Sequence, residues 1–368
     1  MYFCLERQLI MKEKNIVLTG GGTAGHVTPN IALIPSLKKA GYQITYIGSY
    51  QGIEKGLIEE QKIPYYGISS GKLRRYLDIK NFSDPFRVLK GYYEAKHILK
   101  QIKPNVVFSK GGFVSVPVVF AASRCHIPVI IHESDITPGL ANRLSFPFAS
   151  KVCCNFPETV KMLPEGKAVL TGSPIRSELR TGNRKSGLSF AHLSGEKPVI
   201  LVMGGSQGAA SINQAVRSLL PKLLNQFQVI HICGKNNLDP SLENTKDYSQ
   251  FEYIKAELKD VFAAADLMIS RAGANSICEI LALRKPNILI PLSKASSRGD
   301  QILNAQSFQK QGFSAVIEEE NLTQEVLLQT VKKVYQTRGQ YIEKMKKSEL
   351  TDSISIITSL IKELSAKE

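Results

Sequence analysis

One stretch near the start of the chain, residues 15–32, most constrains what the chain can fold into. Its sequence is NIVLTGGGTAGHVTPNIA. Residues 16–18 form a short apolar run typical of a buried β-strand, and a helix can begin only after residues 20–25 have turned the backbone. Glycine lets a ligand approach the backbone closely, and the start of a helix presents N–H groups that attract an anion such as a diphosphate. The stretch therefore predicts a strand, an anion-binding loop and a helix.

The same arrangement occurs again in the second half of the chain. Residues 199–202 form an apolar run, MGGSQGA follows, and a helix is expected from Ser211. Throughout, short apolar runs alternate with glycine-rich or polar turns and with helices, which predicts parallel sheets covered by helices on both faces. We therefore expect an α/β fold with two Rossmann-like domains facing each other across a cleft. The expected strands lie at residues 16–18, 44–47, 63–68, 105–108, 128–131, 152–154, 168–170, 199–202, 229–234, 251–254, 267–270 and 287–291.

Composition indicates where the two domains end. At 368 residues the chain is long enough for two cores. Residues 11–180 form the first expected domain and residues 197–349 the second, with the polar stretch 182–197 as the expected linker. Residues 353–364 have helical periodicity, so a C-terminal helix within residues 350–368 is expected to pack back on the first domain.

Cofactors and metals are not expected. The glycine loop matches the spacing of a dinucleotide fingerprint, but the second strand ends in Gly48 and Ser49 rather than in the acid that would bind a ribose. This argues against a nicotinamide or flavin cofactor. The six cysteines have no metal-ligand spacing and are expected to be reduced thiols, and the chain contains no D-x-D motif that would indicate a divalent metal.

The start of the chain indicates its location. Residues 1–10 carry Glu6 and Arg7 and so do not form a signal peptide, and we interpret them as an upstream extension. No apolar run approaches the roughly 20 residues that span a bilayer. The expected location is the cytoplasm, or a membrane surface on the cytoplasmic side.

Positive charge is concentrated in the first half of the chain. The net charge is +15, and through Arg176 there are 23 Lys and Arg against 12 Asp and Glu. This favours an anionic partner, either a membrane surface or a nucleic acid. In residues 71–103, basic side chains alternate with apolar and aromatic ones, as at a membrane interface, although an ordinary helix with a solvated basic face would show the same pattern. The expected contacts are Leu73, Arg74, Arg75, Tyr76, Phe82 and Phe86.

Three stretches of the second half carry side chains suited to a nucleotide sugar. Ser206 adds a hydroxyl to the N–H groups of a helix start, which suits a phosphate, although it could simply cap the helix. After a later strand, Arg271 could offset diphosphate charge and Glu279 could accept from ribose hydroxyls, unless the segment is only a capped surface helix. Asp300 and Gln301 are an adjacent acid and amide, a pair that can grip sugar hydroxyls.

Seven motifs in this chain resemble those of the MurG family. They are GGGTAGHVTPN, SKGGFVSVP, HESDITPGLAN, TGSPIR, GGSQGA, SRAGANSICE and RGDQILNA, in this order, and they span nearly the whole chain from about Lys14. The resemblance implies the GT-B fold, with the acceptor held by the first domain and the nucleotide sugar by the second. It also implies a peripheral membrane glycosyltransferase of peptidoglycan synthesis. Its substrates would be UDP-N-acetylglucosamine and undecaprenyl-diphosphate-linked N-acetylmuramoyl-pentapeptide.

The resemblance also assigns site residues. It places the loop around Thr23 beside the donor sugar and diphosphate, the backbone of Ile254 on the uracil, Glu279 on the ribose and Gln301 on the sugar. The basic and aromatic stretch coincides with the family's membrane-association patch. The implied donor-binding residues are Thr23, Ala24, Gly25, Asp135, Arg176, Ser206, Ile254, Arg271, Ala274, Asn275, Ser276, Glu279, Asp300 and Gln301.

The implied reaction is a single inverting displacement at the anomeric carbon. His26 is the first choice as general base, because an imidazole near its unperturbed pKa is competent at neutral pH, and Glu133 and Asp135 are the alternatives. Two helix starts, after Gly205 and after Gly273, and Arg176 would stabilise the leaving UDP without a metal.

Two positions depart from motifs that many family members share. Ala24 stands where they have glycine, and Asp135 ends an HESD motif where they have HEQN. An ionised Asp135 can accept a hydrogen bond but cannot donate one, so its sugar contact differs from that of an amide.

Other functions remain open at this point. A transferase of the same fold could act on another lipid acceptor, such as a diacylglycerol, and the lipid it glycosylates would distinguish it. A UDP-N-acetylglucosamine 2-epimerase would epimerise the sugar with no acceptor. A non-enzymatic binder would show salt-sensitive binding without UDP release, but the chain contains no defined nucleic-acid motif, and nucleic acid is not an expected partner.

Overall fold

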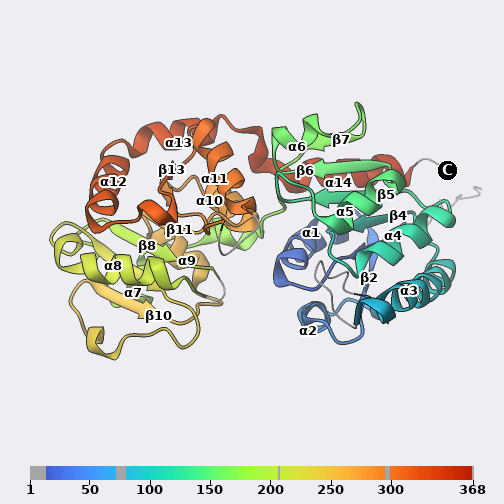
Figure 1. Ribbon diagram of the computed structural model, residues 1–368, viewed down its shortest axis with the longest axis horizontal. Helices are drawn as coiled ribbons and strands as arrows, with labels where there is room; N and C mark the ends of the chain where they lie inside the picture. The colour runs from blue at the N-terminus through green and yellow to red at the C-terminus, as the bar shows by residue number, and fades with distance from the viewer. Residues whose placement is uncertain (1–13, 72–79, 206–207, 295–298, 367–368) are drawn as a thin grey trace, which may run out of the picture. The chain divides into compact units, whose positions relative to one another are not determined.

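Contacts divide the chain into two compact α/β units. The computed structural model describes residues 14–71, 80–205, 208–294 and 299–366 (Figure 1). The first unit comprises Met1–His132, Gly139–Val152 and Ser355–Glu368, and the second comprises Glu133–Pro138 and Cys153–Ile354. By their contacts residues 153–180 group with the second unit, while β7 (Ala168–Leu170) within them is a strand of the first sheet, so the expected domain bound at residue 180 stays a prediction.

The first sheet has its earliest strand in its interior, at the point where the strand order reverses. Its order is β3-β2-β1-β4-β5-β6-β7, and β1 pairs in parallel with β2 on one side and β4 on the other. Ile16, Val17 and Leu18 of β1 are fully buried, as expected for a strand with helices on both faces of its sheet. The strands are β1 (Lys14–Thr19), β2 (Tyr42–Ser49), β3 (Tyr65–Ile68), β4 (Val106–Ser109), β5 (Val129–Glu133), β6 (Lys151–Cys154) and β7 (Ala168–Leu170).

The helices of the first unit include one from the far end of the chain. In α14 (Ser353–Ser365), Thr358 Oγ1 lies 3.1 Å from Ser36 Oγ of α1, and Ser365 Oγ accepts a hydrogen bond from Tyr42 at 2.9 Å. The end of the chain is thus part of the unit in which the chain begins. The other helices are α1 (Thr28–Lys39), α2 (Ile53–Glu59), α3 (Lys80–Ile102), α4 (Ser115–Arg124) and α5 (Leu140–Ser145).

The second sheet repeats the topology of the first. Its order is β10-β9-β8-β11-β12-β13, again with the earliest strand beside the point where the order reverses, and its pairs are parallel. Two parallel doubly wound sheets are the fold that the sequence predicts. The strands are β8 (Val199–Met203), β9 (Gln228–Ile232), β10 (Tyr248–Phe251), β11 (Leu267–Ser270), β12 (Asn287–Leu289) and β13 (Ala315–Val316).

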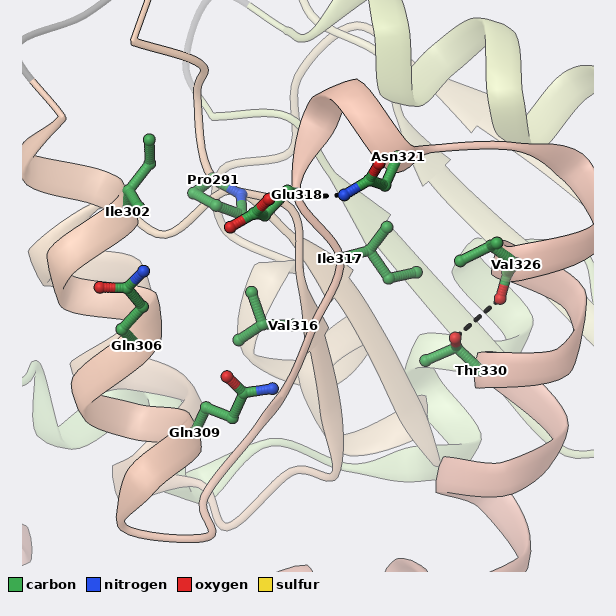
Figure 2. A pocket seen from close by; sticks show the side chains of 10 residues that line it. All are labelled: Pro291, Ile302, Gln306, Gln309, Val316, Ile317, Glu318, Asn321, Val326 and Thr330. Carbon is green, nitrogen blue, oxygen red and sulfur yellow. Dashed lines mark hydrogen bonds between the residues drawn. The ribbon is translucent and has the colours of Figure 1, made fainter.

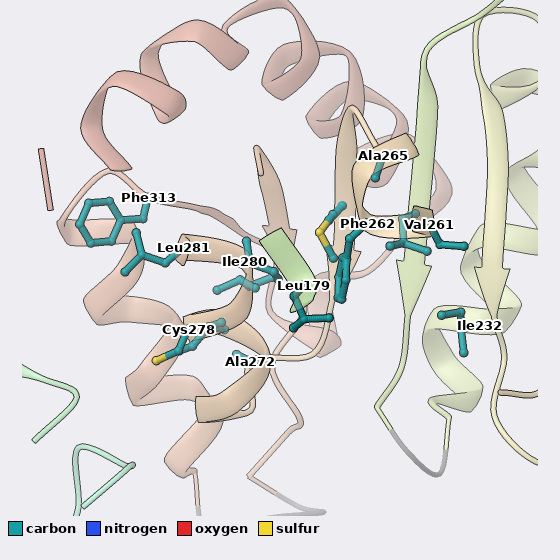
Figure 3. Packing of buried hydrophobic residues seen from close by; sticks show 14 of the residues in the cluster. Leu179, Ile232, Val261, Phe262, Ala265, Ala272, Cys278, Ile280, Leu281 and Phe313 are labelled. Carbon is teal, nitrogen blue, oxygen red and sulfur yellow. The ribbon is translucent and has the colours of Figure 1, made fainter. Parts of the chain in front are cut away.

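Helices cover both faces of the second sheet. Alternate residues of β8 point to opposite faces, so Ile200 and Val202 join one apolar cluster while Val199 and Leu201 join the other. Figure 3 shows part of the second of these clusters, around Phe262 and Ile280. The helices of this unit are α6 (Pro157–Lys161), α7 (Arg184–Phe190), α8 (Ala210–Leu223), α9 (Leu258–Ala264), α10 (Ala274–Ala282), α11 (Asp300–Lys310), α12 (Gln324–Gln336) and α13 (Arg338–Lys346).

The prediction of a linker at residues 182–197 was wrong, because α7 lies there. Asn183 caps this helix by accepting from Ser186 N at 3.1 Å. Its closest contact with α9 is made by a small residue, since a side chain on Gly187 would meet the Asp260 carbonyl at 2.1 Å, and Ala191 is fully buried. Leu188 and Phe190 pack against the same core but are only partly buried. Because glycine and alanine give little hydrophobic signal, a packed helix has the composition of a linker.

One predicted strand lies elsewhere, and one short strand was not predicted. The strand predicted at residues 251–254 lies earlier, at β10, so Ile254 belongs to the loop that follows it. The two-residue strand β13 was not predicted, because so short an edge strand has no detectable periodicity.

Candidate active site

Most of the predicted site residues follow the carboxyl end of a parallel strand. Thr23 to His26 follow β1, Asp135 follows β5, and Ile254 follows β10, while Arg271 and α10 follow β11. Asp300 and Gln301 begin α11, after β12. These positions lie where ligands bind in doubly wound sheets. The two units are described separately below.

Buried polar groups hold the glycine loop of the first unit at its base. Tyr46 donates a hydrogen bond to the Gly20 carbonyl at 2.7 Å. Asn30 Nδ2 and Lys110 N donate to the Thr19 carbonyl at 3.1 and 2.9 Å. The end of β1 is therefore fixed by β2, α1 and the turn after β4.

Glu54, which the sequence analysis missed, holds the middle of the same loop. Its carboxylate, 0% exposed, accepts from Gly22 N at 3.2 Å and from the backbone and hydroxyl of Ser49 at 3.0 and 2.5 Å. The prediction that this loop receives an external anion needs correction at Gly22, because a side chain of the protein already occupies that N–H group. The only sequence signal was an acid a few residues beyond Gly48, without the spacing of a dinucleotide site.

His26 lies at the exit of this loop with a half-buried imidazole. Burial, reinforced by the charge of Lys110, lowers the pKa of His26 to about 4, although a hydrogen bond to Gly21 and the charge of Glu54 act in the opposite direction. Thr23 Oγ1 lies 3.1 Å from His26 Nδ1. The imidazole is thus neutral at pH 7, the form that can accept a proton. Thr23 and Ala24 are exposed, and Gly25 is half-buried.

The two alternative bases, Glu133 and Asp135, are engaged in holding their own turn. The buried Glu133 carboxylate accepts from Ser134 N and Asp135 N at 2.7 and 3.0 Å. Asp135 Oδ1 accepts from Asn304 Nδ2 of α11 at 3.1 Å, and Asn304 Nδ2 also donates to the Ala272 carbonyl. This arrangement favours a structural role for Glu133, and Asn304 is a further residue that the sequence analysis missed.

In the second unit, Glu279 and Arg176 form an electrostatically coupled pair. Burial raises the pKa of Glu279 to about 7, although the charge of Arg176 acts to lower it. Within the described residues, Arg176 Nε is buried and has no hydrogen-bond partner, while its Nη1 bonds Glu178 at 3.2 Å. Glu279 lies in the second turn of α10, whose first residues are Ala274, Asn275 and Ser276. A helix start, an arginine and a carboxylate are suited to a diphosphate and its ribose.

Arg271 does not fit the role predicted for it. Its Nη1 donates to the carbonyls of Ile290 and Pro291 at 3.1 and 3.2 Å, and its Nη2 bonds Ser211 Oγ at 3.0 Å and Glu319 Oε1 at 2.5 Å. Glu319 Oε2 also accepts from the backbone of Ser293. The guanidinium thus ties together the segments that follow β8, β12 and β13, and we do not assign it to a diphosphate.

The remaining predicted residues are partly placed. Gln301 Oε1 accepts from Leu292 N at 3.2 Å, and this bond orients its amide. Ile254 is buried, and Asp300 is half-buried in the first turn of α11. Ser206 lies outside the described residues, as do Leu73, Arg74, Arg75, Tyr76 and the side chain of Phe82.

A separate hollow of about 340 Å³ lies between α11 and α12 and contains none of the predicted site residues (Figure 2). Its lining is mostly apolar and amide side chains, such as Ile302, Gln306 and Gln309. Glu318 is its one charged lining residue among those described. Because it offers no cation, this hollow is a poor match for a diphosphate.

The described residues contain neither a metal-binding cluster nor a membrane-spanning helix. No group of three His, Cys, Asp or Glu side chains in those ranges is arranged to hold a metal ion. None of the helices in the same ranges is both long and apolar enough to cross a bilayer.

Comparison with known families gives two matches. Residues 16–154 match the glycosyltransferase family 28 N-terminal domain, and residues 199–363 match the glycosyltransferase family 28 C-terminal domain. Together the two matches cover most of the chain, and their order follows the order of the two sheets.

Relatives with assigned names share much of the sequence. A protein of Lachnoclostridium phytofermentans is 66% identical over 354 residues, 96% of this chain and 100% of the relative. One of Lachnospira eligens is 64% identical over 350 residues, 95% and 99% of the two chains. Both are named UDP-N-acetylglucosamine--N-acetylmuramyl-(pentapeptide) pyrophosphoryl-undecaprenol N-acetylglucosamine transferase.

A solved structure is also similar. The crystal structure of Acinetobacter baumannii MurG superposes with a TM-score of 0.76 at 26% identity, over 95% of this chain and 99% of that one. The likeness therefore includes both sheets.

The bonds of Arg271 generate the first testable prediction. Arg271→Gln is expected to destabilise the protein by about 2 kcal/mol or more, because it leaves buried carbonyls and the Glu319 carboxylate without their donor. Thermal unfolding of the full chain measures this loss. Lys346→Gln is the control and should unfold like the parent, since both partners of its ion pair with Glu343 are exposed. Equal unfolding of the parent and Arg271→Gln would show that the network does not stabilise the fold.

Proposed function

The chain belongs to glycosyltransferase family 28 and to the family of its N-acetylglucosaminyltransferase relatives, and from this premise we propose the reaction that it catalyses. It transfers N-acetylglucosamine from UDP-N-acetylglucosamine to undecaprenyl-diphosphate-linked N-acetylmuramoyl-pentapeptide, a step of peptidoglycan synthesis. The observation that carries this proposal is the 66% identity over 96% of the chain. The two Rossmann-like units are those of the GT-B fold, which the MurG crystal structure shares.

The bond changes of this transfer set what the residues must do. The 4-hydroxyl oxygen of the acceptor sugar attacks the anomeric carbon, the bond from that carbon to the diphosphate breaks, and UDP leaves with the bonding electrons. The configuration inverts and a β-1,4 bond forms. The hydroxyl proton needs an acceptor, and the departing diphosphate needs positive charge.

We assign the proton to His26. Its pKa is lowered from the unperturbed value that the sequence analysis assumed, so the imidazole is neutral at pH 7 but a weaker base than expected, and Thr23 Oγ1 lies at its Nδ1. A neutral imidazole carries one N–H, and the ring nitrogen without it is the proton acceptor. Glu133 is less suited, because its carboxylate is already hydrogen-bonded to its own turn.

The second unit supplies the donor site. The N–H groups at the start of α10 and the guanidinium of Arg176 are placed to compensate the charge of the diphosphate without a metal ion. Glu279 would accept from the ribose hydroxyls, Gln301 would contact the sugar, and the backbone of Ile254 would contact the uracil. The other contacts proposed in this unit are Asp135, Ser206, Ala274, Asn275, Ser276 and Asp300, and those proposed from the first unit are Thr23, Ala24 and Gly25.

The exposed face of α3 supports a membrane contact. Phe86, Leu89 and Tyr93 are 76%, 53% and 61% exposed, and their spacing of three and four residues puts them on one side of the helix. Arg87 and Lys90 beside them are also exposed. Acyl chains would receive the apolar side chains and anionic headgroups would hold the cations. We therefore propose a peripheral location at the cytoplasmic face of the cell membrane.

The function is tested by UDP release from UDP-N-acetylglucosamine with purified protein. We expect release only when the lipid-linked muramoyl-pentapeptide is present, with N-acetylglucosamine appearing on that lipid. A diacylglycerol acceptor serves as the control. Release with diacylglycerol alone would contradict the proposed acceptor, and epimerised donor in the absence of any acceptor would contradict the transfer itself.

His26→Ala is expected to lower kcat by about 10²- to 10⁴-fold, with the KM for the donor unchanged, because the variant loses a general base but keeps the donor site. In the parent, the fall in kcat that reports protonation of His26 should lie near pH 4 and be absent in His26→Ala. His97→Ala, on the exposed side of α3, is the control. Near-parent turnover by His26→Ala at saturating donor would move the base to another residue.

The membrane contact is tested with vesicles. A triple variant, Phe86→Ser, Leu89→Ser and Tyr93→Ser, should bind anionic vesicles at least about 10-fold more weakly than the parent, because each exposed apolar side chain contributes when it is buried in lipid. A double variant of exposed residues in the second unit, Leu238→Ser and Tyr253→Ser, should bind like the parent. Equal binding by the triple variant and the parent would show that α3 is not the contact.

A further inference from the structure

Glu54 is a fully buried carboxylate for which the proposed reaction has no direct use. It lies in the first turn of α2, and its hydrogen bonds go to Gly22, which follows β1, and to Ser49, which ends the neighbouring strand β2. In doubly wound folds the N–H groups of this glycine loop bind the phosphate of a nucleotide. Here one of them binds a carboxylate of the same chain.

We propose that Glu54 is an internal anion that takes the place of a phosphate at the first glycine loop and positions that loop, and with it His26, for proton transfer. Glu54 is on this view a positioning residue, which touches neither substrate. The first unit would owe its lack of a nucleotide site to this side chain, although it has the loop and the strand order of one.

Three glycines leave the space that this carboxylate fills. A Cβ on Gly21 would lie 2.6 Å from Glu54 Cδ, one on Gly48 2.9 Å from its Cγ, and one on Gly52 2.2 Å from both carboxylate oxygens. None of the three has a positive φ. Their requirement for glycine is therefore a requirement for space around Glu54 and not for an unusual backbone conformation.

The loop connects Glu54 to His26 through a few bonds. Gly22, which Glu54 holds, directly precedes Thr23. The Thr23 carbonyl accepts from His26 N, and its hydroxyl meets His26 Nδ1, both at 3.1 Å. The imidazole also bonds the backbone of Gly21. A shift of Gly22 would therefore move the Thr23 carbonyl, which holds the backbone of His26, and the Thr23 hydroxyl, which meets its imidazole.

Charge provides a second connection. Lys110 lowers the pKa of His26 and Glu54 raises it, so the two buried charges oppose each other at the imidazole. Removal of the negative charge should lower the pKa of His26 further. Displacement of the carboxylate without removal of its charge should change the geometry more than the pKa.

Two substitutions in the full-length protein separate position from charge. Glu54→Gln keeps the volume and removes the charge, and Gly52→Ala keeps the charge but displaces the carboxylate. The matched controls, Glu59→Gln and Gly56→Ala, lie on the same helix. The Glu59 side chain is exposed, and a Cβ on Gly56 would meet nothing within 4 Å. Glu54→Ala, as a third variant, empties the space that a phosphate would fill.

The first readout needs no turnover. In hydrogen-exchange mass spectrometry, the peptide that carries Gly22 should exchange at least 10-fold faster in Glu54→Gln and in Gly52→Ala than in the parent or the controls. Inorganic diphosphate should restore protection of this peptide in Glu54→Ala and leave the parent unchanged. Parent-like exchange in both variants, or no effect of diphosphate on Glu54→Ala, would overturn the proposal.

The second readout rests on the proposed function. The kcat of Glu54→Gln and Gly52→Ala should fall at least 10-fold, with a smaller rise in donor KM because Thr23 to Gly25 of the same loop are proposed donor contacts, and the acid limb of the pH profile should move to lower pH in Glu54→Gln only. A loss confined to donor KM, or one that follows the fraction unfolded, would overturn the positioning role. If Glu54→Gln does not fold, Gly52→Ala carries both readouts. A parent that releases no UDP would contradict the proposed function, and the exchange data would still decide on Glu54.

Discussion

The conformation of the glycine loop after β1 depends on the burial of one carboxylate. A buried anion is stable only where donors surround it and no other side chain takes its space. Glu54 meets both conditions, because Gly22 and Ser49 supply the donors and glycines border the carboxylate. The ends of β1 and β2 and the start of α2 therefore meet at a single charge.

In the second unit, a buried cation joins the segments that follow the strands. Its strand order repeats that of the first unit, yet the segments after β8, β12 and β13 are joined by the guanidinium of Arg271 and its partner Glu319. Structural charges thus fill part of the carboxyl edge in each sheet. The groups that we assign to substrates are different ones: His26 in one unit and Arg176 with Glu279 in the other.

The sequence predicts best what is buried on both faces. The strand expected at residues 267–270 is β11, because a continuous apolar run has no other stable position in such a fold. Helix α7 escaped prediction because Gly187 and Ala191 pack by being small. The roles of Arg271 and Glu54 depend on partners up to 60 residues away, and residue type alone could not distinguish a structural charge from one that binds a ligand.

The position of α14 has a consequence for how the protein is made. The first unit contains both the opening strands and this last helix, with the second unit encoded between them. During synthesis, the surface formed by α1 and β2 stays uncovered while the whole second unit emerges from the ribosome. The second unit therefore has to be synthesised before the unit whose first strands were made earlier can complete its fold.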